Sequence, residues 1–226
     1  MSKKINDFVI RFANVNGSGS ASANGMFAKA IFRMGIPVSP RNIFPSNIQG
    51  LPTWYEVRIS QDGYLGRRGG IDMMVSVNPQ SFAKDVGEVE PGGYMLYDST
   101  KPLDLRHVRR DIHYLGIPLT EMCLREYTDS RQRQLFKNVI YVGALSALLN
   151  IDFSILKDLV SEQFKGKEKL ITPNIHALEM GHQYASTHFE CPLGIHLKAG
   201  EQTPKHIQEF DQILMDGNTA TALGAV

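Results

Sequence analysis

A glycine- and serine-rich run near the amino terminus holds the residues best suited to chemistry. Gly17, Ser18, Gly19 and Ser20 lie in VNGSGSASANG, between the apolar segment FVIRFA and the patterned segment MFAKAIFRMG. Glycines let a backbone approach a phosphate closely, and a helix amino terminus offers unpaired N–H groups and about half a positive charge. The run therefore predicts either a turn that binds the phosphate of a ligand or a turn with a structural role alone.

The same run departs from the fingerprint of dinucleotide-binding proteins. Ser22 stands where the pattern GxGxxG has its third glycine. That fingerprint also needs an acidic residue about 20 positions later for the ribose, whereas the segment from Pro40 to Phe44 holds Arg41 and no acid. These differences argue against NAD and leave NADP open through Arg41. No Gly-Lys-Ser/Thr sequence follows the loop, so it is not a P-loop.

The other reactive residue types show no catalytic or metal-binding spacing. Among the seven histidines, His182 and His188 are six residues apart and would face different sides of a helix. Cys123 and Cys191 are the two cysteines, which cannot supply the four thiolates of an iron–sulfur cluster. No Ser/His/Asp arrangement or paired carboxylates stand out. We therefore expect no catalytic residue, no metal ligand, and two free thiols in a reducing compartment.

The arginines leave two interpretations open. Arg106, His107, Arg109 and Arg110 form a basic run that is either a solvated connection or a contact for phosphate groups or an acidic partner. Arg58 lies inside the strand-like segment VRIS. A charged side chain in a covered sheet needs a partner, so we expect Arg58 to have one.

Composition narrows the class of protein. The 226 residues are 42% hydrophobic and 21% charged, with a formal net charge of +1, which is ordinary for a globular chain. Nucleic-acid binding normally needs a basic surface, so we expect no nucleic-acid partner. The amino terminus has no signal-peptide pattern, and no segment approaches the roughly 18 uninterrupted apolar residues of a membrane span. We therefore expect a cytoplasmic protein that does not contact a membrane.

Hydrophobic periodicity predicts the elements that position these residues. Runs with strand character cover residues 8–13, 53–60, 71–78, 94–98 and 112–119, and helical runs cover 23–34, 79–89, 134–149, 153–164 and 174–188. Between residues 37 and 52, four prolines leave room for short strand pieces only. We expect Ser18 or Ser20 to cap the first helix and Asp152 a later one. The alternation predicts an α/β fold: a Rossmann-like, mostly parallel sheet with helices on both faces and a helical C-terminal part.

Long motifs resemble one known family. The segment VNGSGSASANGMFAKAIFRMGIPVSPRNIFPSNIQGLPTWYEVRIS, with GGIDMMVSVNPQSFAKDV and EPGGYMLYDS, closely resembles the gamma domain of 2-oxoacid:ferredoxin oxidoreductases. The 2-oxoglutarate type, in which gamma and alpha domains are fused, matches best. KNVIYVGALSALLNID resembles the central helix of that domain, and DGNTATALGAV resembles the opening of the alpha domain, which is related to thiamine-diphosphate-binding domains.

The resemblance implies a domain organisation and a set of partners. It implies a gamma domain over residues 1–195, a linker over 196–212, and the start of a truncated alpha domain over 213–226. The residue pattern itself predicts a short strand at 213–215 before a helix. It also implies a beta subunit and the remainder of the alpha domain as partners, with ferredoxin reached through the complex. Thiamine diphosphate, Mg and the iron–sulfur cluster would lie in those other parts.

Site residues follow from the same resemblance. Many gamma domains read GxGGQG at the first loop, where this chain has Gly17-Ser18-Gly19-Ser20-Ala21-Ser22. The positions carried over are Gly17 and Gly19 with Ser18 and Ser20 in the loop, Gly50 and Thr53 in QGLPT, and Arg58 in VRIS. We expect them to form a surface for coenzyme A or for a partner domain rather than a catalytic site.

Three hypotheses about function remain open from the sequence. The first is an accessory gamma domain that supports coenzyme A-dependent oxidative decarboxylation of a 2-oxoacid, with electrons passed to ferredoxin, and that is inactive alone. The second is a free-standing Rossmann-like nucleotide-binding oxidoreductase. The third is an assembly domain without a ligand.

Overall fold

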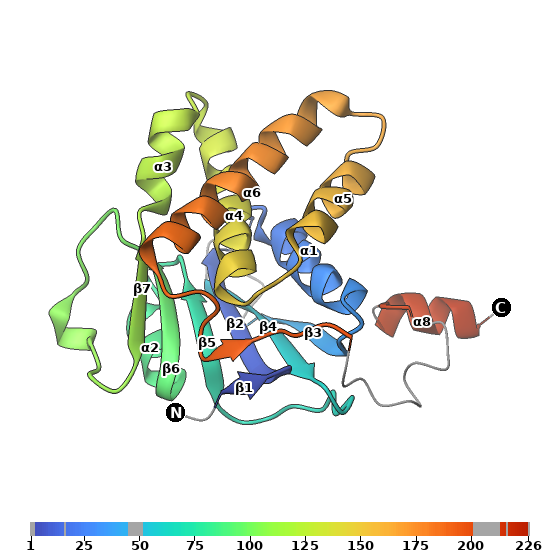
Figure 1. The fold of residues 1–226 in the computed structure, drawn as a ribbon, viewed down its shortest axis with the longest axis horizontal. Coiled ribbons are helices and arrows are strands. Elements are labelled where there is room, and N and C mark those ends of the chain that lie inside the picture. The colour runs from blue at the N-terminus through green and yellow to red at the C-terminus, as the bar shows by residue number, and fades with distance from the viewer. Residues whose placement is uncertain (1–2, 16, 45–51, 201–212, 216, 226) are drawn as a thin grey trace.

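The protein is built around one six-stranded sheet. The structure, a computed structural model, describes residues 3–15, 17–44, 52–200, 213–215 and 217–225. Within them the strand order is β3-β4-β2-β5-β6-β7 (Figure 1). The strands are β2 (Asp7–Val15), β3 (Val38–Ile43), β4 (Pro52–Ser60), β5 (Ile71–Ser76), β6 (Val89–Asp98) and β7 (His113–Ile117).

The sheet is mostly parallel, as predicted. Neighbouring strands β2, β5, β6 and β7 run parallel to one another, whereas β4 runs antiparallel to both β2 and β3. Strand β3 is longer than the short pieces expected from its prolines. Pro40 is tolerated there because β3 is an edge strand, where a missing N–H donor costs no ladder bond on the open side.

Helices cover both faces of the sheet, as the periodicity predicted. On one face, α1 (Ser20–Arg33) and α4 (Ser130–Leu148) pack on the strands, and α5 (Phe153–Gln163) and α6 (Glu168–His188) pack against these two helices (Figure 1). Short helix α2 (Phe82–Glu88) covers the other face. The helical C-terminal part also contains α3 (Leu119–Glu126).

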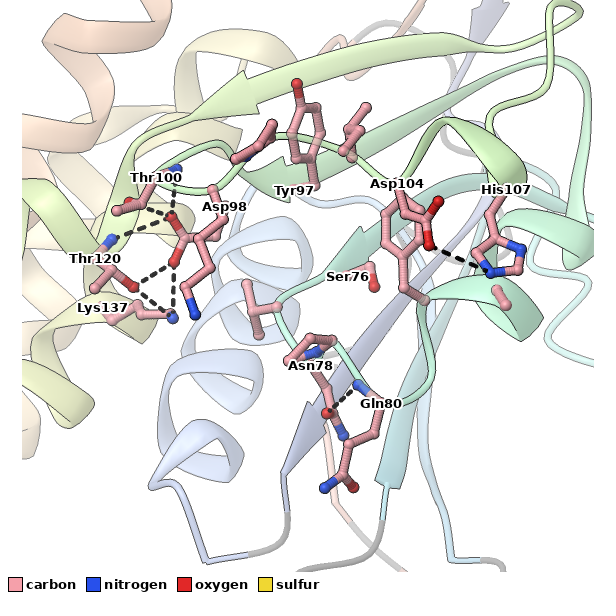
Figure 2. A pocket seen from close by; sticks show the side chains of 17 residues that line it. Ser76, Asn78, Gln80, Tyr97, Asp98, Thr100, Asp104, His107, Thr120 and Lys137 are labelled. Carbon is pink, nitrogen blue, oxygen red and sulfur yellow. Dashed lines mark hydrogen bonds and ion pairs between the residues drawn. The ribbon is translucent and has the colours of Figure 1, made fainter.

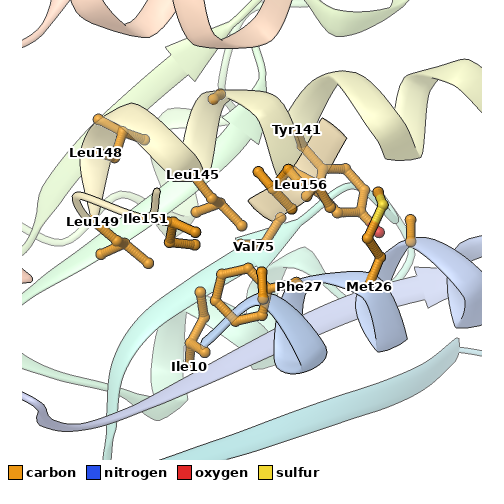
Figure 3. Close-up of a cluster of buried hydrophobic side chains, with 14 of the residues drawn as sticks. Ile10, Met26, Phe27, Val75, Tyr141, Leu145, Leu148, Leu149, Ile151 and Leu156 are labelled. Carbon is orange, nitrogen blue, oxygen red and sulfur yellow. The ribbon is translucent and has the colours of Figure 1, made fainter. Parts of the chain in front are cut away.

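Alternating side chains of β2 explain why both faces are covered. Phe8, Ile10 and Phe12 enter the larger core beneath α1 and α4, while Val9 and Ala13 enter the smaller core beneath α2. Figure 3 shows Ile10 in the larger core, with side chains from α1, β5 and α4 around it. A strand buried on both faces is apolar along most of its length, which made FVIRFA recognisable although it contains Arg11.

A row of charges crosses three strands of the sheet. Arg11 of β2, Glu56 of β4 and Arg41 of β3 are direct neighbours in the two antiparallel ladders. Arg11 donates to Oε2 of Glu56 from Nη2 at 2.5 Å and from Nε at 3.0 Å, and Arg41 donates to Oε1 of the same carboxylate. Arg11 also pairs with Glu88 of α2. Each charge in this largely buried row therefore has a partner.

Two glycines set the spacing of the helical layer. Gly143 of α4 faces the backbone of Leu178, and Gly181 of α6 faces the backbone of Ile140 and Ala144. A Cβ at either position would overlap backbone atoms of the other helix. The close packing predicted for Gly143 is confirmed, and Gly181 is its partner from the facing helix.

The last part of the chain differs from the sequence expectation. The linker was expected to begin at residue 196. Instead, β8 (Ile195–His196) pairs in parallel with β1 (Lys4–Ile5), and Leu193 and Leu197 are buried. Residues 213–215 form no strand, so the expected strand there is wrong, while the helix expected after it is α8 (Gly217–Gly224). The apolar side chains of this tail were too few to separate strand from irregular chain.

Other element boundaries also differ from the prediction. The helix expected from residue 79 begins at Phe82, because Asn78 accepts a hydrogen bond from the backbone N–H of Gln80 in a turn. Helix α3 was not predicted as a separate element. The predicted cap at Asp152 is confirmed, since its carboxylate accepts from the N–H of Ser154 at 2.9 Å. No helix in the described ranges is long and apolar enough to cross a bilayer.

Replacing Gly181 with alanine tests the helix crossing. We expect Gly181→Ala to lower the free energy of unfolding by about 2 kcal/mol, because the new Cβ forces two helix backbones apart. Gly25→Ala in α1 is the matched control, since its Cβ would meet open space, and it should stabilise by about 0.5–1 kcal/mol. Urea unfolding measures both. Equal changes in the free energy of unfolding would show that the crossing of α4 and α6 can accommodate an additional methyl group.

Candidate functional site

The glycine- and serine-rich run forms the turn between β2 and α1. Gly17 and Gly19 have φ angles of 82° and 78°, the left-handed region that favours glycine. Gly19 is the residue that precedes α1, and no side chain caps the helix. The predicted cap by Ser18 or Ser20 is therefore wrong. The left-handed glycine leads the chain directly into the helix and leaves its first N–H groups without a side-chain acceptor.

Helix α4 supports this turn from behind. Nδ2 of Asn138 donates to the carbonyl of Ser18 at 2.9 Å. A Cβ at Gly19 would overlap the side chain of Leu135. One turn further along, the Tyr141 hydroxyl donates to Oδ1 of Asn24 at 2.7 Å. The turn is thus held by backbone conformation and by α4 together, and its glycines allow the close approach.

The turn lies at the carboxyl ends of the parallel strands, a border of the sheet that we call the carboxyl edge. The connections that follow neighbouring strands diverge there. The chain leaves β2 through α1 on one face and leaves β5 through α2 on the other. In open α/β sheets, ligands bind outside the carboxyl ends of strands at such a point. The first turn of α1 contains no acidic residue, so the positive end of its dipole is not neutralised there. This edge can bind an anion.

Asn14 is a buried polar residue at the same edge. It is 2% exposed, and its Oδ1 accepts no hydrogen bond within the described part of the chain. Thr53 lies directly opposite Asn14 in the β2–β4 ladder. A buried acceptor without a donor costs free energy, so a donor group at this edge would stabilise it.

The structure brings together some of the predicted site residues and separates others. Gly17, Ser18, Gly19 and Ser20 follow the carboxyl end of β2, where Thr53 lies opposite Asn14. Arg58 lies five residues further along β4, about 17 Å away at the strand rise. Its partner, which the sequence left unnamed, is Asp7, at 2.5 Å between Nη2 and Oδ1. Gly50 falls outside the described residues.

The geometry argues against dinucleotide binding through Arg41. In a dinucleotide-binding fold, the second strand lies beside the first, but here β4 separates β3 from β2. Arg41 is also engaged by Glu56. Arg41, the residue that allowed NADP binding in the sequence, is therefore separated from the turn by one strand and is already paired with Glu56.

The basic run after β6 is largely paired. Arg106 donates to Asp104, and Arg109 donates to Asp111 at 2.6 Å and to the carbonyls of Val86 and Val89. These bonds tie the connection to α2 and to the start of β6. Of the two interpretations of this run, the structure favours the solvated connection for Arg106 and Arg109.

A second polar group at the carboxyl edge was missed by the sequence analysis. Asp98, the last residue of β6, lines a cavity of about 610 Å³. It accepts hydrogen bonds from the backbone N–H of Thr100 at 3.2 Å and from the hydroxyl of Thr100 at 2.7 Å. It also accepts from the backbone N–H of Thr120 at 3.2 Å and from the hydroxyl of Thr120. A fifth bond comes from the ammonium of Lys137 at 2.9 Å (Figure 2). The signal in the sequence is a carboxylate directly at a strand end in YMLYDST.

These bonds change the acidity of Asp98. Burial raises its pKa, but the hydroxyl of Thr120 and the charge of Lys137 outweigh that effect and lower the pKa to about 2. The carboxylate is therefore ionised at any ordinary pH. It links three elements, since Thr120 belongs to α3 and Lys137 to α4.

The described residues offer binding groups rather than reactive ones. Burial raises the pKa of Cys123 to about 11 and also raises the pKa of Cys191, so neither thiol is activated. The described residues contain no cluster of three His, Cys, Asp or Glu side chains placed to hold a metal ion. What the carboxyl edge offers is an open helix terminus, a buried acceptor and a cavity.

Comparisons with known proteins converge on one group. Residues 9–184 match the family described as pyruvate ferredoxin/flavodoxin oxidoreductase. The chain is 23% identical over 223 residues to 2-oxoacid:ferredoxin oxidoreductase 2, subunit alpha, of Aeropyrum pernix, covering 82% of this chain and 35% of that subunit. It is 25% identical over 174 residues to 2-oxoglutarate synthase subunit KorC of Archaeoglobus fulgidus, covering 76% and 87%. It thus spans about a third of the first relative and most of the second.

One solved structure shares the fold over most of the chain. The 2-oxoglutarate:ferredoxin oxidoreductase of Magnetococcus marinus, with 2-oxoglutarate, coenzyme A and succinyl-CoA bound, superimposes with a TM-score of 0.77. The match has 23% sequence identity and covers 88% of this chain and 34% of that one. At this identity it supports the fold assignment.

The pH dependence of stability tests the Asp98 contacts. A carboxylate with a lowered pKa stabilises the folded state above its unfolded pKa and loses this effect as the pH falls through about 2. We expect Asp98→Asn to cost about 2 kcal/mol of unfolding free energy at pH 7 and progressively less between pH 4 and pH 2. Urea unfolding across this range measures it. Asp62→Asn, in an exposed turn, should cost under about 0.5 kcal/mol throughout. A cost for Asp98→Asn that does not change with pH would contradict the assignment.

A double substitution separates backbone strain from steric overlap at Gly19. We expect Gly19→Ala to cost about 1–2 kcal/mol because its φ of 78° disfavours a side chain. Since Leu135 is flexible and half exposed, removing it with Leu135→Ala should not restore the loss. Thermal and urea unfolding of the four proteins give the coupling between the two sites. Full rescue in the double variant would mean that overlap, and not φ, requires the glycine.

Proposed function

The chain belongs to the pyruvate ferredoxin/flavodoxin oxidoreductase family, and on that premise we propose that it is the gamma domain of a 2-oxoacid:ferredoxin oxidoreductase. Such an enzyme converts a 2-oxoacid, coenzyme A and oxidised ferredoxin into an acyl-CoA, carbon dioxide and reduced ferredoxin. The observation that carries the proposal is the family match from β2 to α6, the whole layered part of the fold. In this assignment residues 1–195 are the gamma domain and 213–226 open the alpha domain.

The role of the domain is binding. Coenzyme A carries a diphosphate and a 3′-phosphate, and the amino terminus of α1 offers N–H groups and a positive dipole with no acidic side chain in its first turn. Gly17 and Gly19 let the backbone approach a phosphate, and Thr53 supplies a hydroxyl at the same edge. These groups fit the anionic end of coenzyme A and orient it. Arg58 plays no part in this contact, because it lies at the opposite edge of the sheet.

The redox and decarboxylation groups belong to other parts of the complex. Thiamine diphosphate with Mg supplies the carbanion chemistry in this family, and an iron–sulfur cluster carries the electrons. A cluster needs four thiolates, and this chain has two cysteines, one of them buried in the core. The residues of this chain therefore do not fit the cluster. The partners are the remainder of an alpha domain and a beta subunit, which pass electrons to ferredoxin.

The oxoacid we propose is 2-oxoglutarate. The relative from Archaeoglobus fulgidus and the structural neighbour from Magnetococcus marinus both carry 2-oxoglutarate in their names, and this supports the choice. The family name itself refers to pyruvate, so the two acids must be compared directly. A free-standing nucleotide-dependent oxidoreductase is less favoured, because β4 separates the turn from β3 and Arg41 is paired.

Activity of the assembled complex tests the proposal. The chain, joined to the remaining parts of its complex, should reduce ferredoxin in the presence of 2-oxoglutarate and coenzyme A, with a higher kcat/KM than with pyruvate. The chain alone should reduce neither ferredoxin nor NADP. Turnover by the chain alone would overturn the assignment, and a preference for pyruvate would overturn the oxoacid.

A charge at the helix terminus tests coenzyme A binding within that assay. Ser20→Asp places a carboxylate at the first residue of α1, where it repels phosphate but stabilises the helix by about 0.3–1 kcal/mol. We expect the KM for coenzyme A to rise at least fivefold, with the KM for the oxoacid unchanged. Ser186→Asp adds the same charge on an exposed turn of α6, outside both the turn and the cavity, and should change neither. An unchanged KM for coenzyme A in Ser20→Asp would show that coenzyme A does not bind at this edge.

A further inference from the structure

The cavity beside Asp98 is separate from the turn before α1. It lies at the carboxyl ends of β5 and β6, between the connections that follow these strands. Much of its wall is apolar, with Val77, Pro79, Phe82, Pro102 and Leu103 among the lining residues. Its volume of about 610 Å³ falls within the range of small-molecule sites, roughly 300–1,000 Å³. The proposed contact with coenzyme A uses none of these side chains.

Most acceptors in the cavity wall are already used by the protein. Asp98 receives five hydrogen bonds, which saturate its two oxygens. On the other side, Asp104 is engaged by the guanidinium of Arg106 at 2.6 Å. Asn78 uses its Oδ1 to accept from the backbone of Gln80. These three side chains therefore have little capacity left to accept hydrogen bonds from a ligand, which disfavours amines and polyols.

Donors remain available on the same wall. The ammonium of Lys137 has three N–H groups, of which two are used, toward Asp98 at 2.9 Å and Thr120 at 3.0 Å. Lys101 is exposed and has no ion pair within the described residues. Figure 2 shows Asp98 and Lys137 on one side of the cavity, with Asp104 and His107 on the other side.

The charges of the lining residues leave one positive charge without a partner. Lys137 is balanced by Asp98, and Asp104 is balanced by Arg106. Lys101 is then uncompensated, while His107 is 3.9 Å from Asp104. A single anionic group complements this field. A phosphate dianion would carry twice the charge of Lys101 and would lie near two carboxylates, which disfavours it.

We propose that this cavity binds a small organic monocarboxylate with a ring or a branched apolar body. Its carboxylate faces Lys101 and the free N–H of Lys137, and its body packs against Phe82 and Leu103. The site is additional to the coenzyme A contact and does not depend on the proposed enzyme activity. It gives the domain a second small-molecule site on the carboxyl edge.

Three probes of similar size and different charge test the proposal on the purified chain. Phenylacetate, 2-phenylethanol and 2-phenylethylamine are titrated into 15N-labelled protein. We expect phenylacetate to shift amide signals of residues 77–83 and 98–104 with a dissociation constant of roughly millimolar, as its size allows. The alcohol should bind at least fivefold more weakly, and the amine should not bind. Equal shifts of the amide signals with all three probes would show that the cavity binds apolar molecules without regard to charge, and would overturn the proposal.

Substituting the exposed lysine removes the charge without disturbing the wall. Lys101→Met should weaken phenylacetate binding about three- to tenfold and leave the alcohol unchanged. Lys165→Met, an exposed lysine outside the cavity, is the matched control and should change neither. A thermal unfolding scan confirms that each variant is folded. Unchanged phenylacetate affinity in Lys101→Met, or shifts confined to other parts of the chain, would overturn the proposal.

Discussion

The position of one buried helix, α4, determines the geometry of the carboxyl edge. Its adjacent residues Lys137 and Asn138 reach two different places there, the Asp98 carboxylate and the carbonyl of Ser18. Its Gly143 contacts the backbone of α6 closely, so the second layer of helices holds α4 against the sheet. Because packed interiors deform little, the turn before α1 and the cavity beside β6 keep a fixed relation to each other.

The sequence was most informative where periodicity is strong. Strands buried on both faces are apolar along most of their length, so FVIRFA and IDMMVS were recognisable despite Arg11 and Asp72. The α/β class followed from the alternation of such strands with helices. The antiparallel direction of β4 could not be predicted, because a strand has the same alternation of side chains in either direction. The cap of α1 depended on the φ of Gly19, which no pattern of side chains encodes.

Contacts between distant residues explain what sequence reasoning missed at the site. Asp98 and Lys137 are 39 residues apart, and their pairing depends on the fold bringing β6 beside α4. Arg58 matched a family motif, but a motif gives order along the chain and not the edge of the sheet at which a residue lies. The glycine turn was found because its conformation depends on neighbouring residues in the sequence. Binding by backbone groups leaves a short, contiguous signature, whereas a cluster of side chains does not.

The charged row across β2, β4 and β3 has a consequence for strand pairing. Side chains of a strand alternate between faces, so a slip of β4 by one residue would move Glu56 to the face away from Arg11 and Arg41. The slip would also separate Trp54 from Asp85, which accepts its indole N–H at 2.8 Å. Out of register, the buried carboxylate of Glu56 would lose both of its guanidinium partners, so the row acts as a register lock. Among the pairings that this lock selects is that of Thr53 with Asn14, at the edge where the proposed ligand arrives.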